Sequence, residues 1–194
     1  MTKTIEFYFD FGSPTVYLAS TQLPLIAERN GAILEYHPIL LGGIFKATDN
    51  QSPAAVPAKG AYMGIDLPRF AKRYNVPFQH NPYFPVNTLP LMRGAISYQM
   101  EGDFNKYLET IFNAMWVEPK DLNKPEEIAE TLLEGGFDPN EFMERISDQK
   151  VKDALIANTE KIVEKGAFGA PTIFVGEEMF FGQDRLDFVE EALK

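Results

Sequence analysis

The stretch TIEFYFDFGSPTVYLA, residues 4–19, decides the fold. Its β-branched and aromatic run Thr4–Phe9 predicts a strand that starts close to the first residue. Gly12 breaks this run, and the pair Ser13-Pro14 then matches a helix N-cap followed by proline at the first helical position. A strand that leads straight into a helix indicates an α/β fold.

The next strand completes a β-α-β unit. The helix that begins at Pro14 is expected to end near Asn30-Gly31, a common C-terminal signal, and Ile33–Ile39 predicts the second strand. A helical connection of this kind predicts that the second strand lies parallel to the first, with a right-handed crossover.

The rest of the chain divides into a helical block and an end that contains strands. The block is expected to form helices at Ala61–Tyr74, Leu89–Met100, Phe104–Val117, Pro125–Leu133, Pro139–Ile146 and Gln149–Lys165. Strands return at Thr172–Val175 and Met179–Phe181, and a last helix is expected over Asp184–Leu193. Without the helical block, this order predicts one mixed sheet with helices on its faces.

The composition is that of a globular, acidic chain without thiols. Of its 194 residues, 45% are hydrophobic, which is enough for a sizeable core. Its net charge of −10 makes it a poor candidate for binding nucleic acid or an anionic membrane through bulk charge. The absence of cysteine excludes disulfides, thiolate metal sites and cysteine redox chemistry. The two histidines, His37 and His80, show no metal-ligand spacing, so no metal site is expected.

The sequence also predicts a cytoplasmic location. No apolar run approaches the roughly 20 residues that a membrane helix needs. The first residues, MTKTIEFYFDF, lack the apolar segment and the cleavage site of a secretory signal peptide.

Ser13 is the first candidate for chemistry. The start of a helix offers free N–H groups and the positive end of the helix dipole, and both favour an anion. A hydroxyl at this position can donate a hydrogen bond to a thiolate that a ligand supplies. The alternative is purely structural, since serine before proline is also a good N-cap.

Further segments carry candidate residues, each with a structural alternative. Pro171 precedes a strand and could form a cis peptide bond with Ala170, although most X–Pro bonds are trans. Asp184 could bind a ligand ammonium or cap the last helix. Asn50 and Lys59 lie in a loop, where a lysine is usually solvated.

Several longer motifs, in matching order along the chain, resemble one known family. They are FYFDFGSPTVYLA (Phe7–Ala19), PILLGGIFKATDNQSP (Pro38–Pro53), PAKGAYM (Pro57–Met63), FPVNTLPLMR (Phe84–Arg93), GAFGAPTIFV (Gly166–Val175) and FFGQDRL (Phe180–Leu186). Together they span the chain nearly end to end and are similar to the 2-hydroxychromene-2-carboxylate isomerases and the kappa-class glutathione transferases.

The resemblance implies a thioredoxin-like fold with an inserted all-helical domain, similar to the DsbA arrangement. The thioredoxin-like domain would comprise residues 1–58 and 166–194, and the helical insertion residues 59–165. In redox relatives a Cys-x-x-Cys motif occupies the helix start, where this chain has SPTV beginning at Ser13. A disulfide oxidoreductase is therefore untenable, whereas a serine-type member of the family needs no cysteine.

The resemblance also implies a role toward glutathione for each candidate residue. Ser13 would hydrogen-bond and stabilise the thiolate. Ala170, just before a cis Pro171, would pair its backbone with the cysteinyl backbone of glutathione. Gln183 and Asp184 would hold the γ-glutamyl end, with Asp184 on the ammonium.

Two more groups of residues follow from the resemblance. Asn50 and Lys59 match positions near the glycyl end of glutathione, where Lys59 could meet a carboxylate. The residues that recognise the second substrate carry over least firmly, and each is alternatively a core or loop residue. These candidates are Tyr83, Phe84, Asn87 and Trp116.

The implied activity is a glutathione-dependent isomerisation in aromatic compound catabolism. It would interconvert 2-hydroxychromene-2-carboxylate and trans-o-hydroxybenzylidenepyruvate-type keto acids by thiolate addition, rotation and elimination, with glutathione as a regenerated cofactor. The alternatives are a kappa-like transferase that releases a glutathione conjugate, and a non-catalytic thioredoxin-fold binding module. Relatives are commonly homodimers, so the resemblance implies a homodimer.

Overall fold

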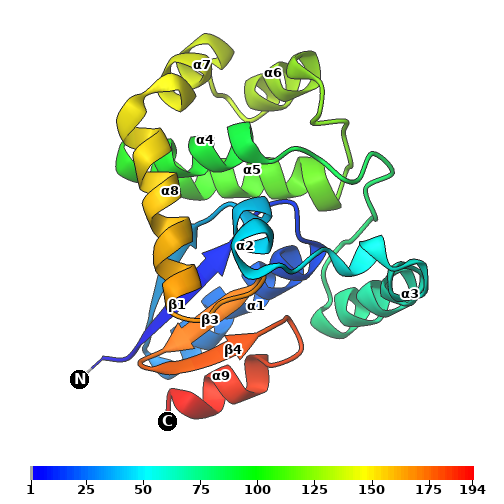
Figure 1. Ribbon diagram of the computed structural model, residues 1–194, viewed down its shortest axis with the longest axis vertical. Helices are drawn as coiled ribbons and strands as arrows, with labels where there is room; N and C mark the ends of the chain where they lie inside the picture. The colour runs from blue at the N-terminus through cyan, green and yellow to red at the C-terminus, as the bar shows by residue number, and fades with distance from the viewer. Residues whose placement is uncertain (1) are drawn as a thin grey trace.

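The computed structural model describes residues 2–194 as a small sheet covered by helices (Figure 1). The strands are β1 (Thr4–Phe9), β2 (Ile33–Pro38), β3 (Thr172–Val175) and β4 (Glu178–Phe181). The helices are α1 (Pro14–Asn30), α2 (Leu41–Thr48), the short 3-10 helix η1 (Pro53–Ala55), α3 (Pro57–Tyr74), α4 (Leu89–Met100), α5 (Phe104–Trp116), α6 (Pro125–Glu134), α7 (Pro139–Ser147), α8 (Gln149–Glu164) and α9 (Leu186–Ala192). Every strand and helix expected from the sequence is present, within a few residues of its predicted bounds.

The sheet has the order β2-β1-β3-β4 within residues 2–194. β1 pairs in parallel with β2, from Thr4 opposite Ile33 to Phe9 opposite Pro38, as the β-α-β unit predicts. β3 pairs antiparallel with both β1 and β4. The sheet is therefore mixed, and it confirms the thioredoxin-like fold.

Helices cover both faces of the sheet. α1 and α9 pack on one face, whereas α4 and α8 pack on the other. Between these layers, Ile5, Phe7 and Phe9 of β1 share one face of the strand and are completely buried, and Tyr8 on the opposite face is only 1% exposed. Burial on both faces explains the nearly continuous apolar character of this strand.

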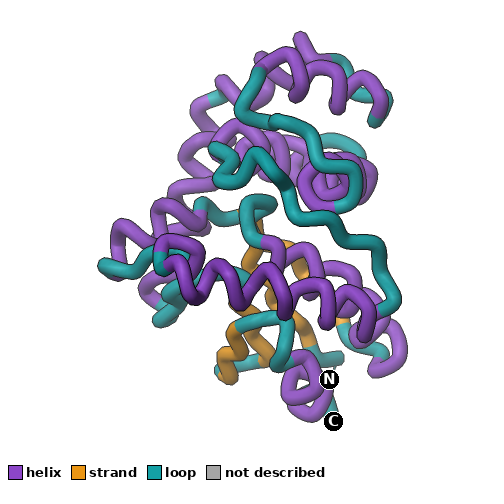
Figure 2. The backbone as a smooth tube through the Cα atoms, turned by 90° about the vertical axis from the view of Figure 1, so that its right-hand side faces the viewer, coloured by secondary structure: helices purple, strands orange, loops and turns teal. Residues whose placement is uncertain are grey.

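The helices α4–α7 gather mainly beyond the end of the sheet toward which β1 points, and α8 runs from this helical layer back along the sheet (Figure 1). α4 contacts α5, α7 and α8, but α3 packs on α1 and η1. The loop 75–88 then carries the chain from α3 up to α4 along one side of the molecule (Figure 2). The domain boundaries at 58/59 and 165/166 stay a prediction, and both α3 and α5 of the predicted insertion contact α1.

Two elements differ from the prediction. The sequence pattern does not predict α2, because Gly42 and Gly43 weaken its helical character; packing against α8 stabilises it in the fold. The last helix begins at Leu186, two residues later than Asp184.

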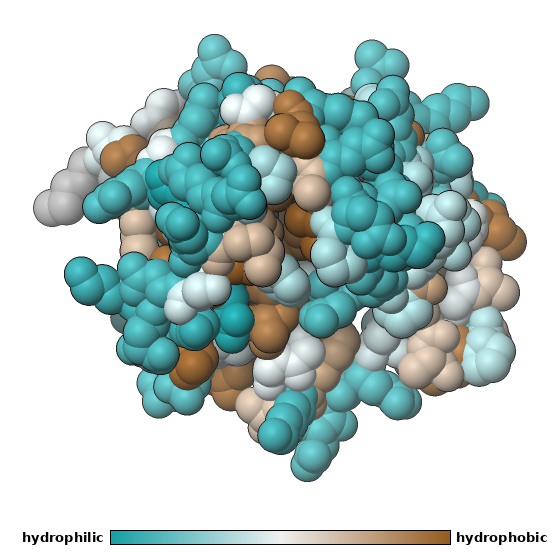
Figure 3. Space-filling model, turned by 90° about the horizontal axis from the view of Figure 1, so that it is seen from above, coloured by the Kyte–Doolittle hydropathy of each residue, from teal (hydrophilic) through white to brown (hydrophobic). Residues whose placement is uncertain are grey.

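The surface seen from the end formed by α6 and α7 is mostly hydrophilic, with hydrophobic side chains in small areas (Figure 3). Among residues 2–194, no helix combines the length and hydrophobicity needed to cross a lipid bilayer. The same residues contain no group of three metal-ligating side chains that could hold an ion. The residues predicted to act on a ligand gather around the start of α1 and the loop before β3.

Candidate active site

Ser13 is the N-cap of α1. Its backbone is extended, with φ −102° and ψ 118°, and Pro14 is the first helical residue, as the sequence predicts. The Val16 amide donates to the Ser13 hydroxyl over 3.4 Å, which is longer than an ordinary hydrogen bond. Ser13 is buried, with 7% of its surface exposed. The hydroxyl is therefore a weak cap that can also serve other partners.

The Ser13 hydroxyl lies between Thr15 and Ala170. Its Oγ is 2.8 Å from Thr15 Oγ1 and donates to the Ala170 carbonyl over 3.1 Å. Thr15 Oγ1 reaches the same carbonyl over 3.4 Å. Because each hydroxyl carries one proton, a bond donated by Thr15 to Ser13 leaves the Ser13 proton for the carbonyl or for a ligand. The predicted site omits Thr15, whose role depends on this contact with a residue 155 positions away.

The peptide bond between Ala170 and Pro171 is cis, as the resemblance implies. The Pro171 carbonyl accepts a hydrogen bond from the Gly182 amide over 3.1 Å. This bond joins the loop before β3 to the segment after β4. The contacts of Ala170 and Pro171 thus bring Ser13 and the segment after β4 to one end of the sheet.

The segment after β4 positions Gln183 and Asp184. Gly182 has φ +98°, a conformation that favours glycine, and the Tyr74 hydroxyl donates to the Gln183 carbonyl. The Asp184 carboxylate pairs with Arg185 at 2.6 Å, and 41% of its side chain is exposed. Arg185 is the N-cap of α9, so the alternative that Asp184 caps this helix is wrong.

Asn50 and Lys59 lie on the connection from α2 to α3. The Asn50 amide group donates to the Phe168 carbonyl over 2.8 Å, which ties this connection to the loop that leads to Ala170. Lys59 lies in the first turn of α3 and is exposed. It forms no ion pair with any carboxylate in residues 2–194. Asn50 therefore borders the site, and Lys59 is a cation available to an anionic group.

A buried carboxylate, Asp10, supports the loops that carry these residues. Only 1% of Asp10 is exposed; Oδ1 accepts from the Gly12 amide over 2.9 Å and Oδ2 from the Leu41 amide over 2.8 Å. Burial raises the pKa of the Asp10 carboxyl, although both hydrogen bonds favour the charged form and oppose this shift. Asp10 thereby fixes the segment before Ser13 to the start of α2. The predicted site omits Asp10, although an aspartate between aromatic residues could have indicated a buried carboxylate with a specific role.

The residues predicted for the second substrate lie in different environments. Trp116 is completely buried, and its Nε1 donates to the Phe11 carbonyl over 2.8 Å. The Phe84 ring packs on Trp116, with centroids 6.2 Å apart. Tyr83 and Asn87 are exposed in the loop before α4. Trp116 therefore exposes no surface to a ligand, and its hydrogen bond to Phe11 holds the chain just before the site. Contact of the second substrate with Tyr83, Phe84 or Asn87 stays a prediction.

Sequence comparison relates the chain to named proteins. A family model described as a DSBA-like thioredoxin domain matches residues 4–194. The chain is 32% identical over 198 residues to a 2-hydroxychromene-2-carboxylate isomerase of Sphingobium xenophagum, covering 100% of the chain and 99% of that protein. It is 30% identical over 205 residues to glutathione S-transferase kappa 1 of Caenorhabditis elegans, covering 98% and 90%.

Structural comparison agrees with the sequences. A solved 2-hydroxychromene-2-carboxylate isomerase matches with a TM-score of 0.86 and 30% sequence identity, covering 98% of this chain and 94% of that one. The match therefore extends over both the sheet and the helical layer. The chain belongs to the DSBA-like thioredoxin family, as an enzyme of the group formed by the 2-hydroxychromene-2-carboxylate isomerases and the kappa-class glutathione transferases.

Proposed function

We propose that the protein is a glutathione-dependent isomerase that interconverts 2-hydroxychromene-2-carboxylate and trans-o-hydroxybenzylidenepyruvate-type aromatic keto acids. One observation carries the proposal: the Ser13 hydroxyl lies at the start of α1, 3.1 Å from the Ala170 carbonyl, in a chain without cysteine. Such a site can hold a thiolate but cannot supply one, so the reactive sulfur must come with a ligand. The similarity to proteins named 2-hydroxychromene-2-carboxylate isomerase supports this choice of reaction.

The residues around Ser13 fit the groups that glutathione presents. Ser13 offers a hydroxyl for the sulfur, and the Ala170 carbonyl can accept a hydrogen bond from the cysteinyl amide. The Asp184 carboxylate suits the γ-glutamyl ammonium, and the Lys59 ammonium suits a carboxylate. The side-chain amides of Gln183, next to Asp184, and of Asn50, between α2 and α3, offer further hydrogen bonds to glutathione.

Ser13 and Thr15 would act together on the sulfur. Bound glutathione supplies the thiolate that adds to the conjugated acid and leaves after rotation about the former double bond. The Ser13 proton turns from the Ala170 carbonyl to the sulfur, and Thr15 donates to Ser13 Oγ, 2.8 Å away. The start of α1 adds the positive end of its dipole. Hydroxyl and dipole each contribute about 1 kcal/mol, so each lowers the thiol pKa by somewhat less than one unit.

Turnover of 2-hydroxychromene-2-carboxylate, with and without added glutathione, tests the proposal. The purified protein should convert this substrate only in the presence of glutathione. The glutathione concentration should stay constant over many turnovers, because the cofactor is regenerated. Conversion that does not need glutathione, or no conversion in its presence, would overturn the proposal.

A kappa-like transferase is the second candidate, favoured by the similarity to glutathione S-transferase kappa 1. The same residues would serve it, but each turnover would release a conjugate and consume one glutathione. Thiol titration during reaction with 1-chloro-2,4-dinitrobenzene separates the two activities. A non-catalytic binding module is not retained, because the relatives that show the family are named as enzymes.

We also propose that the protein is a cytoplasmic homodimer. The acidic, cysteine-free composition and the family resemblance support this location and assembly. Tyr62 and Ile65, three residues apart on α3, are both more than half exposed, and such apolar side chains suit a contact with a second copy. Light scattering should give twice the mass of the single chain; the mass of one chain at micromolar concentration would contradict the dimer.

A further inference from the structure

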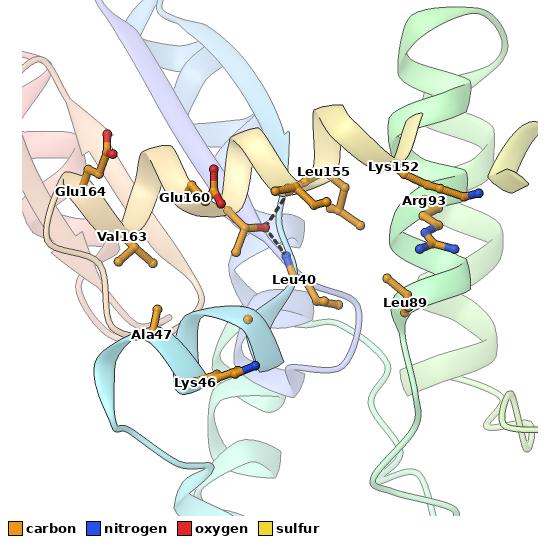
Figure 4. A pocket seen from close by; sticks show the side chains of 13 residues that line it. Leu40, Lys46, Ala47, Leu89, Arg93, Lys152, Leu155, Glu160, Val163 and Glu164 are labelled. Atoms are coloured by element: carbon orange, nitrogen blue, oxygen red, sulfur yellow. Dashed lines mark hydrogen bonds between the residues drawn. The ribbon is translucent and has the colours of Figure 1, made fainter. Parts of the chain in front are cut away.

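A cavity of about 590 Å³ lies between α2, α4 and α8 (Figure 4). Its volume falls in the range of roughly 300–1,000 Å³ that is typical of small-molecule sites. The Leu40 amide donates to the Thr159 hydroxyl over 3.0 Å and holds the start of α2 against α8. The wall is mainly apolar and includes Ala47, Leu89, Leu155, Ile156 and Val163.

The α4 end of the cavity carries only positive charges among its lining side chains. Arg93 and Lys152 lie at this end, whereas Glu160 and Glu164 project from α8 farther along, with Lys46 on α2 below Glu160 (Figure 4). An anion would therefore be attracted more strongly to the α4 end than to the other end. An aromatic ring attached to that anion would lie along the apolar wall.

Arg93 lacks the partners that a partly buried guanidinium normally has. Its Nε is buried and has no hydrogen-bond partner among residues 2–194. Neither Arg93 nor Lys152 forms an ion pair with a carboxylate in this part of the chain. Buried polar groups without a partner are uncommon, and a guanidinium beside an ammonium matches a carboxylate well.

The cavity adjoins the chain segment that carries Ser13. Leu89, in the cavity wall, follows Thr88, and the Thr88 methyl group would lie 3.1 Å from a Cβ atom placed on Gly12. Gly12 immediately precedes Ser13. The start of α4 therefore links the cavity wall to the segment that carries Ser13, the residue proposed to hold the sulfur.

We infer that this cavity binds the second substrate as an aromatic carboxylate, with Arg93 and Lys152 on the carboxylate and the apolar wall on the ring. The inference rests on the proposed function for the identity of the reaction. On this inference, Arg93 and Lys152 determine substrate specificity more than the candidates in the loop before α4 do. The affinity of the site for a neutral ketone of the same shape should not depend on these two cations.

Two conjugated ketones that differ in one group test the assignment. trans-o-Hydroxybenzylidenepyruvate carries the carboxylate, and trans-o-hydroxybenzylideneacetone has a methyl group in its place; both keep the hydroxyl that closes the chromene ring. In Arg93→Gln and in Lys152→Gln, the KM for glutathione-dependent isomerisation of trans-o-hydroxybenzylidenepyruvate should rise roughly tenfold or more. The KM for trans-o-hydroxybenzylideneacetone and the Kd for glutathione should stay within about twofold, because neither depends on these cations.

Matched controls remove the same charges outside the cavity. Arg69→Gln on α3 and Lys150→Gln at the start of α8 should leave the KM for trans-o-hydroxybenzylidenepyruvate unchanged, because neither side chain lines the cavity. Circular dichroism verifies that each variant is folded. Lys152→Gln keeps the test decisive if Arg93→Gln does not fold.

Calorimetry with cinnamate, without glutathione, separates the cavity from the proposed function. Cinnamate should bind the parent and bind Arg93→Gln and Lys152→Gln roughly tenfold or more weakly. If this pattern appears but the parent has no glutathione-dependent activity, the cavity assignment stands and the proposed function fails. If the parent is active but KM and cinnamate affinity do not change in either variant, the cavity assignment is overturned. Absence of cinnamate binding to the parent overturns it as well.

Discussion

Ser13 has two roles that can be separated by measurement. As the N-cap of α1 it accepts one long hydrogen bond, from Val16 over 3.4 Å. Loss of a cap costs about 0.5–2 kcal/mol of stability. Because this hydrogen bond is long, its loss should cost an amount near the lower end of that range. As a donor to sulfur, Ser13 acts on the pKa of a bound thiol, which a cap does not change.

The first prediction is that Ser13→Ala raises the pKa of bound glutathione. The variant loses the hydroxyl but keeps the dipole of α1, so the pKa should rise by somewhat less than one unit, for a bond worth about 1 kcal/mol. Turnover near neutral pH should fall and recover in part at alkaline pH. Thiolate absorbance of the complex against pH, together with a pH–rate profile, measures both effects.

Asp103→Ala is the control for capping, because Asp103 is the exposed N-cap of α5 outside the proposed site. It should lower stability without moving the thiol titration. If Ser13→Ala and the parent titrate and turn over alike, Ser13 is only a helix cap.

A second prediction concerns Thr15, which can donate to Ser13 across 2.8 Å. Thr15→Val keeps the shape of the side chain and removes the hydroxyl. The Ser13 oxygen then loses a donor, so the thiol pKa should rise in the same direction as in Ser13→Ala but by less. Thr21→Val is the matched control, because the Thr21 hydroxyl bonds only within α1: it donates to the Leu18 carbonyl and accepts from the Gln22 side-chain amide. Equal titration curves for both threonine variants would show that Thr15 does not act through Ser13.

At the scale of elements, the turn from β4 to α9 determines where Asp184 lies. Gly182 has φ +98°, and a Cβ atom there would come within 2.6 Å of Asp184 Oδ1. Gly182→Ala should therefore strain the backbone and displace the carboxylate. Glutathione affinity should fall by about 1–2 kcal/mol, part of the value of a hydrogen bond to a charged group.

Gly166→Ala separates strain from displacement. Gly166 has φ +94°, but no atom lies within 4 Å of its Cβ position. Both variants should lose similar stability in urea unfolding, since alanine is unfavourable at such angles. Calorimetry should find weaker glutathione binding only in Gly182→Ala. The same loss of affinity in both variants would mean that Asp184 is not responsible.

Asp10 links two elements through its carboxylate, and its raised pKa predicts a pH dependence of stability. A carboxyl with a folded pKa above its unfolded value of about 3.9 stabilises the fold fully only below that value. This contribution is lost as the pH rises through the raised folded pKa. The free energy of unfolding of the parent, relative to Asp10→Asn, should therefore decrease from acidic toward neutral pH.

Urea unfolding of both proteins over this pH range measures the difference. Asp103→Asn, which removes an exposed carboxylate, controls for the general change in charge. A difference that grows with pH would mean that the hydrogen bonds from the Gly12 and Leu41 amides and from the Thr88 side chain outweigh burial and lower the pKa of Asp10.

At the scale of the molecule, Trp116 connects the helical layer to the site. Its Nε1 donates to the Phe11 carbonyl, two residues before Ser13. Trp116→Phe should leave that buried carbonyl unpaired and cost about 1–3 kcal/mol of stability. Because the unpaired carbonyl lies in the segment that carries Ser13, kcat should fall as well.

Tyr107→Phe is the matched control, because the buried Tyr107 hydroxyl donates to the Leu91 carbonyl within the helical layer. It should lose comparable stability and keep kcat. Parallel losses of kcat in both variants would show a general effect of lower stability instead of a connection through Trp116.

The fold was largely predictable because its decisive signals are local. The run Thr4–Phe9, the cap Ser13-Pro14 and the strand Thr172–Val175 each match the structure. α2 was not predictable, because two glycines weaken its local preference and its stability comes from α8, more than 100 residues away. The start of α9 was misplaced because Asp184 resembles a cap but pairs with Arg185.

The site was less predictable than the fold. Ser13 and Pro171 lie in recognisable motifs, but Thr15, Asp10 and Arg93 gain their importance from contacts between distant segments. No local pattern shows that Thr15 meets Ala170 or that the Arg93 guanidinium lacks a partner. Trp116 illustrates the opposite error, since an aromatic residue that suits a ligand site is here buried by packing.

The place of β3 between β1 and β4 has a consequence for synthesis on the ribosome. Residues 10–171 must be translated before β3 appears, which takes roughly 8–32 seconds at 5–20 residues per second. Until then β1 has one open edge, the kind of surface on which unfinished chains aggregate. Ala170 and Asp184, two of the residues proposed to bind glutathione, emerge in the same late segment as β3, so the proposed ligand would not protect the nascent chain. During this interval the open edge of β1 is a surface that a chaperone for exposed strand edges would cover.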